Sequence, residues 1–232
     1  MTGSIAGGAI LSGTMRGGGS TEPTISPTPT ATQQAEEATP TAEPHQVKTY
    51  PSPPDMTIDT SKQYFAVIET EKGDIRLELF DDEAPETVNN FVFLARDGFY
   101  DGLIFHYVEP EVAAQTGDPT CTVSEAITCM GEGGPGYTLP TETNDKEHAA
   151  GSVAMAEKTD THITNGSQFF IALLDLPQLE GHNIVFGQVT EESMDVVDSL
   201  APRDWRDPNA PPGDQILSVT IEESEETPTP TQ

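Results

Sequence analysis

The sequence predicts a mainly β fold, an antiparallel barrel with two α-helices. Many short stretches alternate apolar and polar residues, as half-buried strands do. Glycine-rich turns separate these stretches, and two amphipathic segments have the spacing of short helices. Many short strands with few helices are typical of an antiparallel barrel, which is the architecture we expect for the folded part of the chain.

Two strands and a helix are expected first. Residues 64–69 and 74–80 alternate and are joined by Lys72-Gly73, which predicts a hairpin. Pro85 suits the first turn of a helix, because its missing N–H would be unpaired there in any case. Gly98 suits the position just after the helix ends. Between them, apolar residues follow helical spacing and predict one buried stripe: Val88, Phe91, Val92 and Ala95.

The sequence of the rest of the domain predicts six further strands and a second helix. The expected strands lie near residues 104–108, 113–116, 152–156, 168–173, 184–189 and 216–221. A short helix near residues 192–200 would bury Met194, Val197 and Leu200.

Both ends of the chain differ in composition from the domain expected at residues 61–223. Residues 1–60 have scattered Pro, Thr, Ser and Gly without an amphipathic period, which predicts a disordered segment that acts as an extended spacer. A short apolar run at residues 5–11 is compatible with the remnant of a signal or membrane anchor, and equally with a disordered terminus. The acidic, Thr-Pro-rich tail at residues 224–232 is also predicted to be disordered.

Charge and hydropathy exclude several function classes. The chain has a net charge of −29, which repels phosphate backbones and argues against nucleic-acid binding. The acidic surface is interpreted as solubilising, with a preference for basic client proteins as the alternative. No stretch approaches the ~20 apolar residues that a membrane span needs.

Six blocks of sequence carry the most specific pattern in the chain. They are FHYV at 105–108, QTGD at 115–118, GEGGPGY at 131–137, SVAMA at 152–156, NGSQFFI at 165–171 and LEGHNIVFG at 179–187. In this order they resemble the cyclophilin-type peptidyl-prolyl cis/trans isomerases, over roughly residues 64–223. The resemblance implies a closed eight-stranded antiparallel barrel capped by two helices. It also implies isomerisation of X-Pro bonds in protein segments during folding, with no cofactor and with proline-containing polypeptides as partners.

The same resemblance assigns roles to residues of a substrate groove. Phe170 would form the floor of the proline pocket, and Gln115 and Gln168 would hold the substrate backbone. Met155 and Leu179 would flank the floor, although these two residues taken alone are better explained as barrel core. The full expected set is Tyr107, Gln115 and Phe170 as catalytic residues, with Val112, Ala113, Gly131, Met155, Ala156, Gln168, Leu179 and Asn183 as substrate-binding residues.

One departure from the family pattern concerns catalysis. Tyr107 stands where the family has its catalytic arginine, and a tyrosine hydroxyl can donate a hydrogen bond but carries no charge. No arginine occurs between Arg96 and Arg203, so none close in sequence replaces it. Lys158 is interpreted as a solvated loop lysine. Two hypotheses follow: an isomerase with reduced activity, and a non-catalytic cyclophilin-like module that binds proline peptides or serves as a scaffold.

Other departures concern the groove wall. Val112 and Ala113 stand for a phenylalanine and a methionine, Asn183 for a histidine, and Gln178 for a tryptophan. The pocket is therefore expected to be wider and less apolar than is usual in the family.

The two cysteines, Cys121 and Cys129, bear on metal binding and on location. No second Cys or His pair lies at ligand spacing, so no metal site is expected. A disulfide between the two cysteines is expected, with two separate buried thiols as the alternative. Because a disulfide implies an oxidising compartment, we expect an extracytoplasmic monomer, tethered to the membrane if an N-terminal anchor is truncated or missing. A cytoplasmic location stays open.

Overall fold

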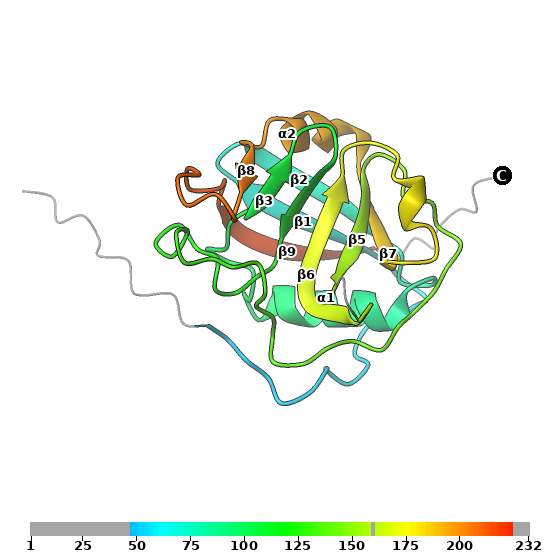
Figure 1. Cartoon of the computed structure of the whole chain (residues 1–232). Coiled ribbons are helices and arrows are strands. Elements are labelled where there is room, and N and C mark those ends of the chain that lie inside the picture. Colours follow the sequence, from blue (N-terminus) through cyan, green and yellow to red (C-terminus); the bar gives the residue numbers. More distant parts are fainter. Residues whose placement is uncertain (1–46, 159–160, 225–232) are drawn as a thin grey trace, which may run out of the picture. The chain divides into compact units, whose positions relative to one another are not determined.

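β-Strands dominate the part of the chain that the structure describes, residues 47–158 and 161–224 of this computed structural model (Figure 1). The strands are β1 (Gln63–Thr70), β2 (Gly73–Leu79), β3 (Tyr107–Glu109), β4 (Ala113–Thr116), β5 (Ser152–Glu157), β6 (Thr164–Ala172), β7 (Val185–Val189), β8 (Arg203–Asp204) and β9 (Ile216–Ser224). The α-helices are α1 (Pro85–Arg96) and α2 (Met194–Asp198), and two short 3₁₀ helices are η1 (Pro177–Leu179) and η2 (Glu191–Ser193). The expectation of a mainly β fold with two α-helices is confirmed.

All nine strands belong to one antiparallel sheet in the order β8-β3-β4-β6-β5-β7-β2-β1-β9. Between the described residues of β8 and β9, at its two ends, no ladder forms. The structure describes nine strands, one more than the eight expected, and the additional strand is β8. That strand pairs with β3 through Tyr107↔Asp204 and Val108↔Arg203. Two residues are too few to show the alternation that identifies a strand.

A cluster of aromatic rings holds α1 against the inner face of the sheet. Phe91 of α1 contacts Tyr100, Phe169 and Phe186, with ring centroids 5.3, 5.6 and 5.4 Å apart. These rings are fully buried, and edge-on and tilted pairs of this kind add to the stability of a core. Because successive residues of a strand point to opposite faces, the packing of Phe169 in the core directs Phe170 to the other face of the sheet.

The ends of the two helices follow local signals. Pro85 begins α1, and Gly98, with a φ of +64°, follows its cap as expected. The second helix is shorter than the expected 192–200: α2 covers only five residues, and Ser199 and Leu200 continue it with tight i→i−3 hydrogen bonds. Pro202 explains this end, because a residue before proline is disfavoured in the helical region. Figure 1 shows α1 and α2 at opposite ends of the sheet.

The segment before the first strand lies against the domain. The Tyr50 N–H donates to the Pro135 carbonyl at 2.8 Å, and the Asn89 side-chain oxygen accepts from the N–H groups of Thr57 and Ile58 at 2.8 and 3.3 Å. The expected boundary at residue 60 therefore leaves out residues 47–60, which contact the domain although they form no helix or strand. The expectations for residues 1–46 and 225–232 fall outside the described residues. Of the helices that the structure describes, none has the length and apolarity needed to cross a bilayer.

Candidate functional site

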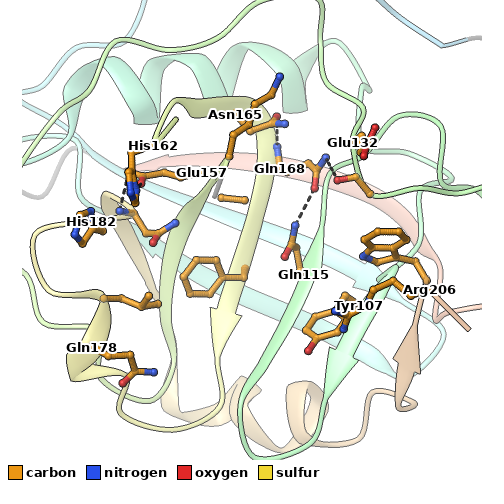
Figure 2. Close-up of a pocket in the computed structure, with 17 residues that line it drawn as sticks. Tyr107, Gln115, Glu132, Glu157, His162, Asn165, Gln168, Gln178, His182 and Arg206 are labelled. Carbon is orange, nitrogen blue, oxygen red and sulfur yellow. Dashed lines mark hydrogen bonds and ion pairs between the residues drawn. The ribbon is translucent and has the colours of Figure 1, made fainter. Parts of the chain in front are cut away.

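A groove of about 1110 Å³ opens on the face of the sheet opposite the aromatic core (Figure 2). The strand register aligns its residues: Tyr107 of β3 pairs with Gln115 of β4, Gln115 with Phe170 of β6, and Phe170 with Ala154 of β5. Side chains at paired positions of antiparallel strands lie on the same face of the sheet. Four neighbouring strands therefore place these side chains side by side on one surface.

Phe170 forms an apolar floor for the groove. Its side chain is 7% exposed and packs with a small cluster that is separate from the main core: Ala154, Ala172, Leu176 and Val185. Val112, Ala113 and Leu179 pack against the edge of this cluster. Leu179 also lines the groove, whereas Val112 and Ala113 support Phe170 without lining it. The Phe170 ring thus presents an aromatic surface to the groove.

Two glutamines form a hydrogen-bonded pair beside this floor. Gln115 Nε2 donates to Gln168 Oε1 at 2.8 Å, and Gln168 Nε2 donates to the carbonyls of Gly131 and Gly133 at 3.1 and 2.7 Å. The Gln168 amide nitrogen thus holds the glycine-rich loop, while its oxygen binds Gln115. In the described part of the chain nothing donates to Gln115 Oε1, so this oxygen can accept an N–H of a bound peptide.

The Asn165-Gly166 turn holds the start of β6 against the glycine-rich loop. Asn165 Oδ1 accepts from the N–H groups of Ser167 and Gln168 at 2.8 and 3.0 Å, and its Nδ2 donates to the Gly133 carbonyl at 3.1 Å. A side-chain amide that caps its own turn in this way is typical of an Asx turn. The turn and the loop are therefore joined by Asn165 and Gln168.

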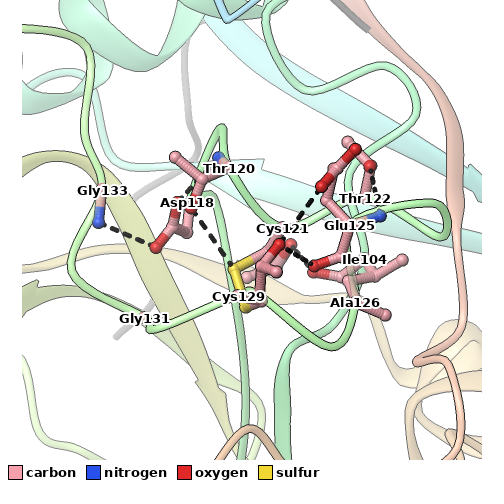
Figure 3. The surroundings of a disulfide bond; sticks show 12 residues. Ile104, Asp118, Thr120, Cys121, Thr122, Glu125, Ala126, Cys129, Gly131 and Gly133 are labelled. Carbon is pink, nitrogen blue, oxygen red and sulfur yellow. Dashed lines mark hydrogen bonds between the residues drawn. A yellow bond between two sulfur atoms is a disulfide. The ribbon is translucent and has the colours of Figure 1, made fainter. Parts of the chain in front are cut away.

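A disulfide anchors the segment that leads into the glycine-rich loop (Figure 3). Cys121 and Cys129 are bonded, with their Cα atoms 4.8 Å apart, so the expected disulfide is present in the structure. Both cysteines are buried against Ile104 and Ala126. The loop that they close ends two residues before Gly131, which lines the groove.

Asp118 fixes the other side of the same loop. One carboxylate oxygen of Asp118 accepts from the N–H and hydroxyl of Thr120 at 2.8 and 2.7 Å, and the other accepts from the Gly133 N–H at 2.8 Å (Figure 3). A Cβ atom at Gly133 would lie 2.2 Å from Asp118 Oδ1, a distance that real Cβ atoms do not adopt. Glycine is thus required at this position, because the Asp118 carboxylate lies too close to the backbone to leave room for a Cβ atom.

At one end of the groove, Tyr107 lies beside Arg206, which is in the turn that follows β8. The Tyr107 hydroxyl donates to the Glu109 carboxylate, and this hydrogen bond raises the pKa of Tyr107, so the side chain is neutral at neutral pH. The Arg206 guanidinium carbon is 5.4 Å from the centre of the Tyr107 ring and 5.8 Å from that of Trp205. Arg206 Nε also donates to Asp204 Oδ1 at 2.8 Å. The pairing of β8 with β3 thus brings a positive charge to Tyr107.

At the other end, polar groups from β5 and from the turn after η1 meet. The Asn183 N–H donates to Glu157 Oε1 at 2.9 Å, and the Asn183 side-chain amide donates to the Met155 carbonyl at 3.0 Å. His162 and His182 lie beside Glu157, with their rings stacked at 4.9 Å (Figure 2). All of these residues except Met155 line the groove.

Comparison with known proteins agrees with this geometry. The family model described as "Cyclophilin type peptidyl-prolyl cis-trans isomerase/CLD" matches residues 65–221. The chain belongs to this cyclophilin family. It is 48% identical to a peptidyl-prolyl cis-trans isomerase of Synechococcus elongatus over 157 residues, which is 67% of this chain and 94% of that protein. A peptidyl-prolyl cis-trans isomerase of Helicobacter pylori is 42% identical over 63% of this chain and 85% of its own length.

Solved cyclophilin structures have the same fold. The crystal structure of a cyclophilin-type isomerase from Cryptosporidium parvum has a TM-score of 0.58 and 29% identity, and the match covers 69% of this chain and 98% of that protein. A second structure of that protein, in the presence of the dipeptide Ala-Pro, has a TM-score of 0.57.

Most residues expected from the cyclophilin pattern line the groove: Tyr107, Gln115, Gly131, Ala156, Gln168, Phe170, Leu179 and Asn183. Met155 is an exception. Its side chain is fully buried in the main core, where it lies opposite Phe169, so alternation along β5 turns it away from the groove. Lys158, interpreted as a solvated loop residue, also lines the groove. Seven further lining residues were not expected from the sequence: Glu132, Glu157, His162, Asn165, His182, Trp205 and Arg206.

Proposed function

We propose that this cyclophilin domain isomerises X-Pro bonds in protein segments, and that Arg206 supplies the positive charge that Tyr107 lacks. The observation that carries the proposal is the cross-strand alignment of Tyr107, Gln115 and Phe170, with the Arg206 guanidinium over the Tyr107 ring. It combines an apolar surface, a hydrogen-bonding edge and a cation in one groove.

The reaction needs no covalent chemistry. Rotation about an X-Pro bond is opposed by amide resonance, with a barrier of ~18–20 kcal/mol. A catalyst must bind the twisted amide more tightly than either planar form, and each 1.36 kcal/mol of that preference is worth about tenfold in rate. As resonance is lost, the lone pair localises on the prolyl nitrogen, where a nearby positive donor stabilises it.

Each part of the groove has a role in this scheme. The proline ring rests on Phe170, and Gln115 Oε1 accepts a backbone N–H of the flanking peptide. Arg206 then approaches the prolyl nitrogen from the β8 side. A guanidinium has five N–H donors, so the bond from Nε to Asp204 leaves donors for the substrate while it restricts the orientation of the side chain.

The exposure of Arg206 supports an activity below that of an enclosed site. Its side chain is 59% exposed, and water and salt screen an exposed charge. A cation in this setting stabilises the developing lone pair less than one held in a closed, dry pocket would. The proposal is therefore an isomerase of reduced rate.

A closed eight-stranded barrel is the architecture proposed for this activity, with β8 as an accessory strand. Backbone hydrogen bonds support closure: Gly102 N–H donates to the Ile216 carbonyl, Ile216 N–H to that of Leu103, and Phe105 N–H to that of Asp214, at 2.8 to 2.9 Å. These bonds link the segment before β3 to the start of β9. A sheet without open edges would hold the groove strands in fixed register.

Location and assembly are part of the same proposal. The buried disulfide supports an oxidising, extracytoplasmic compartment, where a tether before the domain would leave the groove accessible to folding polypeptides. We propose that the domain acts as a monomer and does not bind nucleic acid, since its charge is strongly negative.

Exchange of an Ala-Pro peptide between its cis and trans forms, followed by NMR, tests the proposal. The wild type is expected to accelerate exchange, and Phe170→Ala to lower kcat/KM by about tenfold or more, with weaker peptide binding, because the floor of the pocket is lost. The matched control is Phe65→Ala on β1, where the ring lies under Arg76 and away from the groove. Peptide binding by the wild type without accelerated exchange would instead favour the non-catalytic module.

A further inference from the structure

Three potential metal ligands meet at the end of the groove opposite Tyr107 and Arg206. They are Glu157 at the end of β5, His162 in the following loop and His182 in the turn after η1, and Figure 2 shows their side chains gathered together. One ligand atom from each lies within 4.8 Å of the others. We infer that Glu157, His162 and His182 form a binding site for a divalent transition-metal ion of the Zn²⁺ class.

The carboxylate is already held in place for such a role. The Glu157 side chain is 8% exposed, and its Oε1 accepts the Asn183 N–H at 2.9 Å. The second oxygen, Oε2, faces His162 Nδ1 at 3.4 Å. A buried carboxylate whose one oxygen is fixed by a backbone N–H has the support that metal-binding carboxylates need. Glu157 therefore offers its remaining oxygen toward the His162 imidazole.

The two histidines are exposed and can adjust to an ion. Their rings stack with centroids 4.9 Å apart and an angle of 29° between the ring planes. Ligands around tetrahedral Zn²⁺ lie about 3.4 Å from one another, given bonds of about 2.0–2.1 Å. The ligand atoms therefore need to approach by at most roughly 1.5 Å. Rotamer changes of exposed side chains supply such a shift without movement of the strands.

The backbone takes an unusual conformation in the loop after β5 and in the turn after η1. His162 has a φ of +51° and Asn183 a φ of +52°, the left-handed region that residues other than glycine seldom adopt. The His162 N–H also donates to the Lys158 carbonyl at 2.8 Å, and the His182 N–H to the Leu179 carbonyl at 2.9 Å. Both histidines thus lie on turns that backbone hydrogen bonds stabilise.

The ligand set selects the kind of metal. Two imidazoles and one carboxylate suit Zn²⁺, Ni²⁺ or Cu²⁺, whereas Ca²⁺ and Mg²⁺ prefer oxygen ligands only. Three protein ligands leave a fourth position for water or for a group of a bound molecule, and all three ligand residues line the groove. The net charge of −29 raises the concentration of cations near the surface. The earlier expectation of no metal site considered only the spacing of ligands along the sequence.

Calorimetric titration of the full chain with ZnCl₂ alone tests the inference. The protein carries no histidine tag, and its disulfide is kept oxidised so that Cys121 and Cys129 do not bind the ion. We expect one Zn²⁺ per chain. His162→Ala and His182→Ala are each expected to weaken binding about tenfold or more, because loss even of an indirect ligand partner has effects of that size.

Matched variants distinguish this site from other groups. His45→Ala removes a histidine outside the described residues, and Glu132→Gln removes a groove carboxylate outside the cluster. Neither is expected to change the affinity for Zn²⁺. Glu157→Gln is informative only where thermal unfolding shows a native fold, since Glu157 also binds Asn183, and the two exposed histidine variants do not have this restriction. Unchanged affinity in both histidine variants, or binding lost in His45→Ala, would overturn the inference. The readout is metal binding, so it does not depend on isomerase activity.

Discussion

The floor of the groove and its two ends are built in different ways. The floor consists of buried side chains on adjacent strands, Phe170 and Gln168, which are 7% and 2% exposed and fixed by packing or by hydrogen bonds. The ends carry exposed polar side chains on turns, Arg206 at one end and His162 at the other. A rigid floor can determine which residue of a substrate is bound, whereas the exposed ends can change in charge, or in bound ions, without any change to the core.

Among changes to the rigid floor and the loop that supports it, loss of the disulfide is expected to have the largest effect on stability. Replacing both cysteines by alanine opens a short loop, and the chain-entropy model gives a loss of about 2.5 kcal/mol in the free energy of unfolding. Urea denaturation of the double variant measures this loss. Since the loop leads into Gly131, peptide binding should weaken as well, and unchanged stability and binding would show that the loop does not depend on the bond.

Gly133→Ala tests whether the glycine-rich loop is as rigid as the floor that it supports. The new Cβ would lie 2.2 Å from Asp118 Oδ1, so the loop must shift, at a cost of about 1–3 kcal/mol. Loss of the hydrogen bond from Gln168 to the Gly133 carbonyl should accompany this shift and raise KM. The matched control is Gly134→Ala, whose Cβ would lie 3.3 Å from Asn165 Oδ1 and needs only a small adjustment. Equal thermal stability and equal KM in the two variants would contradict the account.

Asp81 is expected to have the smallest effect on peptide binding and turnover, because it does not line the groove. Burial raises its pKa from 3.8 to about 6. A carboxyl whose pKa is higher in the folded state stabilises the fold below its unfolded value, and this contribution is lost as pH rises through about 6. Asp81→Asn should therefore remove the part of the stability that declines between about pH 4 and 6, with kcat/KM at pH 7 unchanged. Chemical denaturation across this range tests it, and parallel curves for the two proteins would show that Asp81 is not responsible.

The floor could be predicted from the sequence because its residues occur in local blocks. Gln168 and Phe170 lie in one strand, and the pairing of that strand with β4 places Gln115 beside them. Of the expected substrate-binding residues, Val112, Ala113 and Met155 do not line the groove, and Met155 is the one that strand alternation excludes. Its partner across the strands is Phe169, a core residue, so Met155 must face the core as well.

The ends could not be predicted because their residues meet only through tertiary structure. Arg206 reaches Tyr107 through β8, a two-residue strand without a pattern of its own, so the absence of an arginine close in sequence was not decisive. Glu157 and His162 lie five residues apart, but His182 comes from the turn after η1, so the set of three is brought together only in the folded chain. Exposed groups on turns have no periodicity that identifies their partners.

The rate of the Arg206→Gln variant, alone and combined with Tyr107→Arg, tests most directly whether Arg206 supplies the charge in the groove. Loss of the charge should lower kcat/KM for an Ala-Pro peptide by about tenfold with little change in peptide affinity, because the bond forms fully only in the transition state. Tyr107→Arg in the same chain should restore most of this loss. The control Arg96→Gln, which removes a surface ion pair with Glu223, should keep the wild-type rate. A wild-type rate in Arg206→Gln, or no recovery in the double variant, would contradict the proposed role of Arg206.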